Sequence, residues 1–195
     1  ASGAVSFGAS GGTLGGGGTV NGAVTLNNVN QVLSPGNSPE ILKFNTGETW
    51  SSYTYIWELN DWTTSVAGAN FDQVGITGAL DLSGAGTGDI VLDITSLTAL
   101  NVAGNVANFS NIDNQWIILT TTGGITGFDA LDWDVQPSNF TSSPVAGGTW
   151  KVSLSLDGNN VVLDYTAVPE PTVTALFLAG ASLGFLSMGR KRRNS

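Results

Sequence analysis

Carboxylates are the main side chains of this 195-residue chain that could support catalysis, because the sequence contains no His and no Cys. This composition excludes a Ser-His-Asp triad, a Cys-His pair and any metal site built from His or Cys ligands. Two acids that face one cleft could hydrolyse a glycosidic bond if burial raised the pKa of one of them. The candidates are Glu58 with Asp61, and Asp129 with Asp132 and Asp134.

The simpler interpretation of these acids is that they are solvated side chains on turns and on outward strand faces. Asp129, Asp132 and Asp134 offer oxygen atoms suited to calcium, but the sequence has neither an EF-hand loop nor a Gly-Gly-x-Gly-x-Asp repeat. No phosphate-binding or dinucleotide-binding fingerprint is present either. We therefore expect a protein that is not an enzyme and that binds no metal and no cofactor.

Two tryptophans offer a different chemistry. Trp62 and Trp133 fall in the polar stretches Asn60-Asp61-Trp62 and Asp132-Trp133-Asp134. An exposed indole there could stack on a sugar ring, whereas a buried one would cover the core beneath a loop. The first possibility would make the protein a carbohydrate-binding module, and the sequence leaves both open.

The overall composition predicts an all-β body. Only 11% of the residues are charged, against about 25% in typical soluble proteins. Gly, Ser, Thr and Asn take their place, and these residues favour turns and pleated surfaces. The residues that favour helices, such as Glu, Lys, Arg, Gln and Met, are scarce before Val168.

Charge is distributed in blocks along the chain. Four of the six basic residues stand together at Arg190, Lys191, Arg192 and Arg193. Residues 1–168 carry 14 acidic and 2 basic residues, which leaves a net charge of −12. Nucleic acid and anionic membrane surfaces would repel such a body, so we expect neither as its partner.

Several segments alternate apolar and polar residues, which is typical of strands with one buried face. In residues 53–59, Tyr53, Tyr55 and Trp57 share one face and Thr54 lies on the other. The other segments with this pattern are 74–82, 90–95, 150–156 and 161–165, and weaker patterns occupy 20–26, 32–33 and 41–44.

Two further features refine the strand prediction. The turn Asp157-Gly158-Asn159-Asn160 joins the last two alternating segments, so they are expected to form a terminal hairpin. Ile117, Ile118 and Leu119 form an unbroken apolar run, which predicts a strand covered on both faces.

The predicted strands recur at irregular intervals along the chain. This spacing fits a solenoid with loops of varied length, but it also fits a jelly roll or sandwich.

A turn motif favours the solenoid. Ser34-Pro35-Gly36-Asn37-Ser38-Pro39 resembles the SPGNSPG turn of autotransporter-type β-helix repeats, and later strands of those repeats resemble 55–58 and 71–76. The resemblance covers residues 19–82 and departs at Glu40, where those repeats usually have Gly. It implies a right-handed parallel β-helix, with a β-sandwich or jelly roll as the alternative.

The C-terminal tail has a different character. Residues 172–189 contain no charge, and a helix of that length would span about 27 Å, close to a bilayer core of about 30 Å. The basic residues 190–193 follow at once and would stay on the cytoplasmic side. Pro169 and Pro171 disfavour helix just before the span. A permanent single-span anchor would explain the span and its basic end.

The ordered combination of Pro169-Glu170-Pro171, a short apolar span and a basic end resembles the PEP-CTERM sorting signal. This resemblance implies recognition by an exosortase, a membrane-embedded cysteine-dependent enzyme, and removal of the tail near the triplet. Pro169, Glu170 and Pro171 would be the recognition residues, and Arg190, Lys191, Arg192 and Arg193 would orient the tail in the membrane.

Three parts are therefore expected: a Gly-rich, frayed leading segment at 1–18, a β-rich extracellular body at 19–168 and a sorting tail at 169–195. Ala1 is not an initiator Met, so we expect that a signal peptide was removed or that the chain is a fragment. We expect an exported, non-enzymatic surface or exopolysaccharide-matrix protein, anchored transiently in the inner membrane and then released to the cell surface or matrix. The first alternative is an exopolysaccharide-binding module, and the second is a carboxylate glycosidase.

Overall fold

The computed structural model describes residues 3–63, 66–142 and 148–168, and these form an all-β body. The prediction of the fold class is confirmed at this level. Within these ranges the chain has no α-helix, and its one helical turn is the 3-10 turn η1 (Ala130–Asp132). None of the described elements is a helix long and apolar enough to cross a membrane. The span predicted at 172–189 lies outside the described residues.

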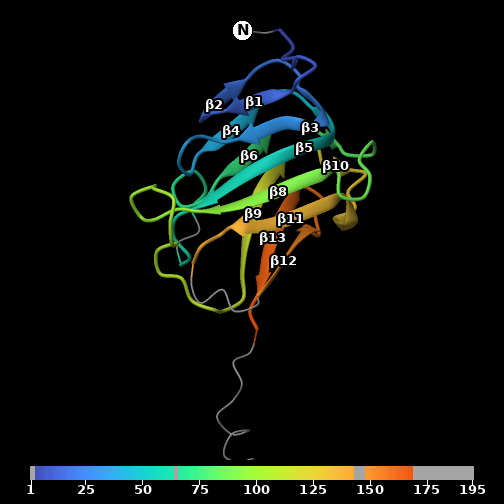
Figure 1. The fold of residues 1–195 in the computed structure, drawn as a ribbon. Helices are drawn as coiled ribbons and strands as arrows, with labels where there is room; N and C mark the ends of the chain where they lie inside the picture. The colour runs from blue at the N-terminus through green and yellow to red at the C-terminus, as the bar shows by residue number, and fades with distance from the viewer. Residues whose placement is uncertain (1–2, 64–65, 143–147, 169–195) are drawn as a thin grey trace, which may run out of the picture.

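The strands form two sheets that face each other, and the strands of each sheet follow one another along the length of the body (Figure 1). In chain order the strands are β1 (Gly12–Gly15), β2 (Gly18–Val20), β3 (Thr25–Ser34), β4 (Ile41–Phe44), β5 (Glu48–Leu59), β6 (Gln73–Ile76), β7 (Leu80–Asp81), β8 (Ile90–Ser96), β9 (Asn114–Thr121), β10 (Ile125–Thr126), β11 (Trp133–Asn139), β12 (Thr149–Leu154) and β13 (Asn160–Thr166). One sheet follows the order β1-β3-β5-β7-β10, with β8 on β5 and β11 on β8, and the other the order β12-β13-β9-β6-β4-β2.

Most of the pairing is parallel, because the chain returns to each sheet in the same direction on successive passes. In the first sheet Leu33 pairs with Tyr55, Tyr55 with Leu92, and Leu92 with Val135. In the second sheet Val20, Phe44, Ile76 and Thr121 are paired in the same way. Equivalent side chains of successive passes therefore lie above one another in columns.

Among the named strands of the described residues, the pairing becomes antiparallel at the C-terminal end of the body. There β13 pairs with β9 on one side and with β12 on the other, so the predicted terminal hairpin is confirmed. Its turn is closed by hydrogen bonds from Ser155 and Asn159 to Asp157, with Gly158 at a φ of 70°. Leu156 was expected to continue the buried face of β12, but pairing stops at Leu154 and Leu156 lies in the turn, fully exposed.

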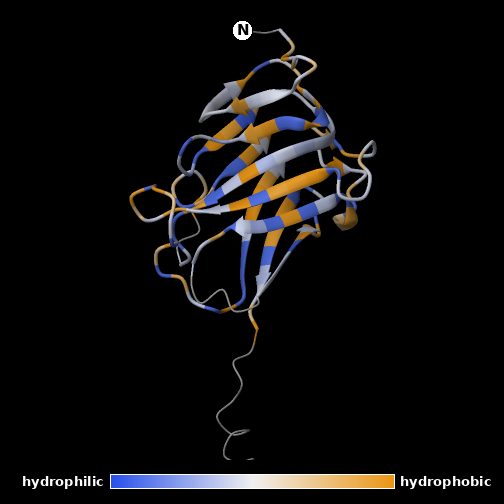
Figure 2. Ribbon diagram, viewed as in Figure 1, coloured by the Kyte–Doolittle hydropathy of each residue, from blue (hydrophilic) through white to orange (hydrophobic). Residues whose placement is uncertain are grey.

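Alternating strands supply the core between the sheets, as Figure 2 shows by the change from orange to blue along β8 and β11. Tyr53, Tyr55 and Trp57 of β5 are all buried on one face, as predicted. The prediction for Ile117–Leu119 is wrong in one respect, because Ile117 is exposed while Ile118 and Leu119 are both buried. A register shift opposite β13 places one extra residue in β9 here, so two consecutive side chains point inward.

The Gly-rich leading segment is also more ordered than its composition predicted. Gly12–Gly15 and Gly18–Val20 form β1 and β2, each paired with the next strand of its sheet. A Cβ added to Gly15 would lie 2.7 Å from the carbonyl oxygen of Ser34. Glycine therefore allows this strand to lie close to β3, and the expectation of a frayed segment up to residue 18 is wrong.

Candidate functional site

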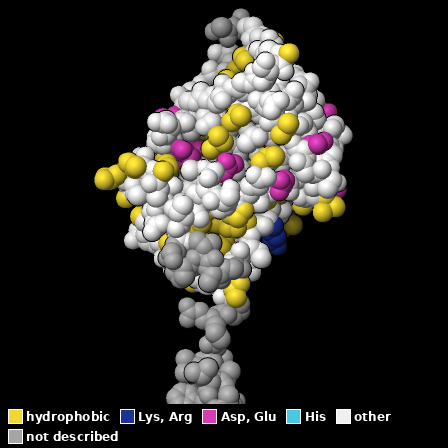
Figure 3. Space-filling model, viewed as in Figure 1, with side chains coloured by type: hydrophobic (Ala, Val, Ile, Leu, Met, Phe, Trp, Pro, Cys, Tyr) yellow, Lys and Arg dark blue, Asp and Glu magenta, His cyan; other side chains and the backbone are white. Residues whose placement is uncertain are grey.

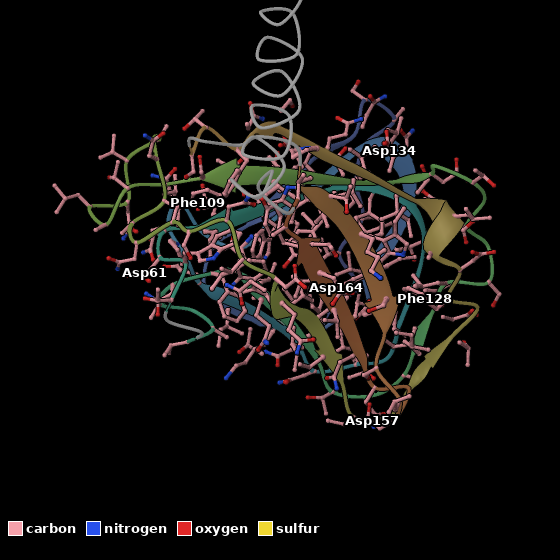
Figure 4. All side chains as sticks on the ribbon, turned by 90° about the horizontal axis from the view of Figure 1, so that it is seen from below. Asp61, Phe109, Phe128, Asp134, Asp157 and Asp164 are labelled. Carbon is pink, nitrogen blue, oxygen red and sulfur yellow. The ribbon has the colours of Figure 1, made fainter. Side chains whose placement is uncertain are left out.

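The structure does not bring the predicted carboxylates together in one cleft. Figure 4 shows Asp61 and Asp134 on opposite sides of the body. Glu58 lies on β5, three residues before Asp61, but burial raises its pKa first and the negative charge of Glu40 raises it further. In the part of the chain that the structure describes, no group of three or more acids is placed to hold a metal ion.

Asp61 joins two loops. Its Oδ1 accepts hydrogen bonds from the backbone N–H and the hydroxyl of Thr63, at 2.8 and 3.0 Å. Its Oδ2 accepts one from Nδ2 of Asn108 at 2.9 Å, and its backbone forms a bridge with Ala107. These contacts fix the loop after β5 to the loop before β9, so Asp61 has a structural role here.

The three acids near β11 also serve local structure. Asp129 caps η1, because its carboxylate accepts a hydrogen bond from the N–H of Leu131 at 2.9 Å. Asp134 accepts one from Nε2 of Gln136 at 2.7 Å. Burial raises the pKa of Asp132, and the negative charges of Asp129 and Asp89 raise it further. Asp129 thus stabilises the turn η1, and Asp134 makes a local contact within β11.

Trp62 and Trp133 are core residues. Their exposed fractions are 1% and 6%. The ring of Trp62 contacts Phe109 edge-on at 4.6 Å between centroids, and Trp133 packs near Phe128 and Tyr53. Stacking on a sugar needs an exposed ring face. The glycan-stacking prediction is therefore corrected for both residues, and they cover the core beneath loops instead.

One buried acid that sequence reasoning missed is Asp72, which is fully buried. Its Oδ1 accepts a hydrogen bond from the N–H of Glu40 at 2.8 Å, and its Oδ2 accepts one from the N–H of Glu58 at 3.1 Å. Its backbone oxygen accepts a third from Nε1 of Trp57 at 2.8 Å. Asp72 thus ties the start of β4 to the end of β5.

A sequence signal for Asp72 did exist. It stands two residues before Val74 and four before Ile76, so period-two alternation places it on the buried face. It is also bonded to Glu40, the position where the sequence departs from the β-helix repeats it resembles. The Cβ atoms that Gly17 and Gly36 lack would lie 2.3 and 2.8 Å from Oε2 of Glu40. Two glycines therefore make room for this carboxylate.

Burial raises the pKa of Asp72 to about 9, and the negative charges of Glu58 and Glu40 act in the same direction. The two backbone N–H donors oppose this shift without cancelling it. Such a proton-holding carboxyl could act as a general acid if a substrate could reach it. Three surface hollows of about 370, 420 and 390 Å³ are each lined by other residues, so none of them leads to Asp72.

A group of hydrogen bonds holds the last described residues, Ala167 and Val168, against the body. The N–H of Ala167 donates to Oδ1 of Asp113 at 2.8 Å, and Nδ2 of Asn111 donates to the carbonyl oxygen of Val168 at 3.2 Å. The hydroxyl of Tyr165 donates to Oδ1 of Asn111 at 2.8 Å. Burial and then the charge of Asp113 raise the pKa of Tyr165, which keeps this hydroxyl protonated as a donor. We call Asn111, Asp113 and Tyr165 the exit clamp.

The exit clamp borders one of the three hollows. This hollow, of about 370 Å³, lies on the outer side of β9, β13 and β12, and is lined by Asp113, Asn114, Gln115, Lys151, Asp164, Tyr165 and Thr166. Figure 4, which views the body from below, shows Asp164 centrally on this side. The lining is polar and of mixed charge.

The predicted sorting residues Pro169, Glu170 and Pro171 and the predicted orienting residues Arg190, Lys191, Arg192 and Arg193 lie outside the described residues. The described chain ends one residue before the triplet, at Val168, which the exit clamp holds. Comparison with protein-family models finds no match to this chain, and comparison with curated proteins finds none either.

Proposed function

We propose that this chain is an exported, non-enzymatic protein of the bacterial surface or exopolysaccharide matrix, sorted by an exosortase through residues 169–195. The observation that carries this proposal is the exit clamp. It fixes Ala167 and Val168 through two backbone hydrogen bonds directly before Pro169. A rigid body would thus hold the start of the processing sequence at a constant position relative to the membrane.

The body would act as a rigid spacer with the architecture of a right-handed parallel β-helix. Its support is the column-like register of both sheets, in which the chain alternates strand by strand between the two sheets from β1 to β7. Parallel strands joined by crossovers are right-handed in about 98% of cases. Repeated passes that contact only their neighbours give an elongated, stiff element. A β-sandwich would require two separate sheets without this repeated alternation between them.

The structural contacts of three of the five candidate carboxylates support a non-enzymatic role. Asp61 binds loop residues, Asp129 caps η1, and Asp134 bonds to Gln136. The carbohydrate-binding alternative loses its main candidates, since Trp62 and Trp133 are buried.

The test is the mass and location of the protein in cells with and without the exosortase. We expect the wild-type body to lose its tail and leave the inner membrane only when the enzyme is present. Replacing Pro169, Glu170 and Pro171 together by Ala should leave the full-length chain in the membrane, because Ala allows helix to extend upstream and removes the carboxylate.

The matched variant truncates the chain after Gly189 and so removes the basic end. It should loosen the orientation of the tail and leave the triplet intact. A wild-type protein that keeps its tail in cells containing the enzyme would be a permanently anchored protein, and the sorting proposal would then fail.

A further inference from the structure

Three hollows on the outer side of the second sheet join into one groove. The hollow of about 370 Å³ beside the exit clamp shares Gln115 with a hollow of about 390 Å³, which in turn shares Gln73 with the hollow of about 420 Å³. The groove crosses β12, β13, β9, β6 and β4, which are consecutive in this sheet. Because neighbouring strands lie about 4.8 Å apart, it is at least about 19 Å long. We call it the sheet groove, and its main lining residues are Lys43, Gln73, Gly75, Gln115, Ile117 and Lys151.

The floor of the sheet groove is open at one end and apolar in the middle. Gly75 pairs with Lys43 on β4 and with Thr120 on β9. A Cβ added to Gly75 would lie 3.7 Å from Oγ1 of Thr120 and 3.8 Å from Cγ of Lys43, so the missing side chain leaves space between them. In the middle hollow, Ile117 is 41% exposed and lies beside Val162 of β13. The floor therefore offers apolar surface to a ligand.

Groups that form hydrogen bonds surround this apolar surface. Nε2 of Gln73 donates to the carbonyl oxygen of Ile117 at 2.9 Å, which holds the glutamine at the rim. This bond uses one position of an amide that has a second N–H and a carbonyl oxygen. Gln115 is exposed at the other junction between hollows, and Thr120 and Thr122 add hydroxyls near Gly75. The rim can therefore both donate to and accept from a ligand.

Charge distinguishes this face from the opposite one. The strands of the first sheet carry five acidic residues and no basic residue. Figure 3 shows acidic side chains spread over the face on which β3, β5 and β8 lie in front. The strands of the second sheet carry Lys43, Lys151 and one acid, Asp164. Both lysines line the sheet groove together with Asp113 and Asp164, so the groove has no net charge on a body of net charge −12.

We infer that the sheet groove binds an extended, neutral polysaccharide. Sugar units present hydroxyl groups, which match the amide and hydroxyl rim, and apolar C–H faces, which match the floor. A polyanion would be repelled by the acidic body, and a polycation would be drawn to the opposite face. A peptide strand fits poorly, because the backbone groups of these strands are already paired within the sheet and only an edge can add a strand.

This inference extends the proposed matrix role by naming the kind of polymer, but it concerns a surface that sorting does not use. Affinity electrophoresis of the full-length chain in detergent tests it. The gels contain one of three neutral polymers (dextran, hydroxyethyl cellulose or galactomannan) or the acidic polymer alginate. We expect retardation by at least one neutral polymer, nearly unchanged from about 0.05 to about 0.5 M salt, and none by alginate. Retardation by alginate, or by none of the neutral polymers, overturns the inference.

Gly75→Ile places the binding in the groove. The added Cβ meets no atom closer than 3.7 Å and Ile favours strands, so the body should fold, as circular dichroism verifies. The filled floor should raise the dissociation constant at least about tenfold. Thr95→Ile puts the same side chain on the outer face of β8 in the first sheet and should bind like the wild type. Unchanged binding by Gly75→Ile, or an equal loss in both variants, contradicts the inference. Removal of the tail in cells with the exosortase should be the same for Gly75→Ile and the wild type, so binding and sorting can fail separately.

Discussion

The parallel-stranded part of the body and its C-terminal end both bury aromatic rings, but they do so by different means. In the parallel part, the single strand β5 places Tyr53, Tyr55 and Trp57 in the core by simple alternation. At the C-terminal end, Trp62, Phe109, Phe140, Trp150 and Tyr165 come from three loops and both strands of the hairpin.

This difference bears on how each part is stabilised. A ring on β5 lies in a column of residues fixed by parallel pairing on both sides, with Leu33 and Leu92 flanking Tyr55. A ring at the C-terminal end depends on loops that are joined by hydrogen bonds outside the strand ladders, such as those of Asp61. The first region should unfold only with the whole body, whereas the second should open locally.

The largest expected effect is that of Trp57→Ala. Trp57 is fully buried, its ring lies 5.6 Å from that of Trp116, and its Nε1 donates to the backbone of Asp72. We expect a loss of about 3–5 kcal/mol in the free energy of unfolding, measured by chemical denaturation. The half-buried Trp150, stacked on Trp116 at 5.8 Å, is the matched site at the hairpin.

Trp150→Ala should cost only about 2 kcal/mol, because less of its surface leaves water on folding. Hydrogen exchange should then rise mainly in β12 and β13 and leave β5 protected. Two results would show that the C-terminal end does not open independently of the parallel part. One is an equal loss of unfolding free energy for Trp57→Ala and Trp150→Ala, and the other is faster hydrogen exchange throughout the body in both variants.

The next effect is the pH dependence of stability set by Asp72. Its ordinary pKa of 3.8 is raised to about 9 in the folded body by burial, so the folded state holds a proton that the unfolded state has lost. Stability should therefore be highest below the ordinary pKa and fall as pH rises to about 9, by at most about 1.4 kcal/mol per pH unit. Burial raises the pKa of Glu48 as well, which acts in the same direction.

Denaturation of the wild type and of Asp72→Asn at several pH values from about 4 to about 9 measures this effect. The variant should show a flatter profile, although its amide can accept only one of the two backbone hydrogen bonds. Asp134→Asn, which removes an exposed charge, should keep the wild-type slope. Parallel profiles for the wild type and Asp72→Asn would show that Asp72 is ionised in the folded body.

The smallest effect is expected at the exit clamp. Asn111→Ala combined with Asp113→Ala removes two exposed hydrogen bonds and the partly buried one from the Tyr165 hydroxyl, and should lower the free energy of unfolding by about 1 kcal/mol. Exchange at the N–H of Ala167 should nevertheless become much faster. Asn139→Ala, which removes a comparable bond to Asp93, is the control. If the double variant unfolds the hairpin, the clamp supports the body itself and does more than hold the exit.

Local alternation was sufficient to predict the core of β5, β8 and the terminal hairpin. Period-two patterns identify a buried face whatever the strand pairs with, because successive side chains point to opposite sides. The same rule, extended two residues before Val74, would have placed Asp72 on the buried face, but this acid was missed because its partners are distant in the sequence. The resemblance of residues 34–39 to β-helix turns pointed to parallel pairing, and both sheets are mostly parallel.

Only the tertiary structure decided the features that depend on distant partners. The extra residue in β9 that turns both Ile118 and Leu119 inward exists because β13 pairs opposite it. Trp62 and Trp133 stand among polar neighbours in the sequence, and packing against rings from other segments buries them. The Gly-rich β1 has little intrinsic preference for a strand, and the edge of β3 supplies the hydrogen bonds that order it. In each case the contact responsible joins residues that are far apart in the sequence, so alternation within one segment could not predict it.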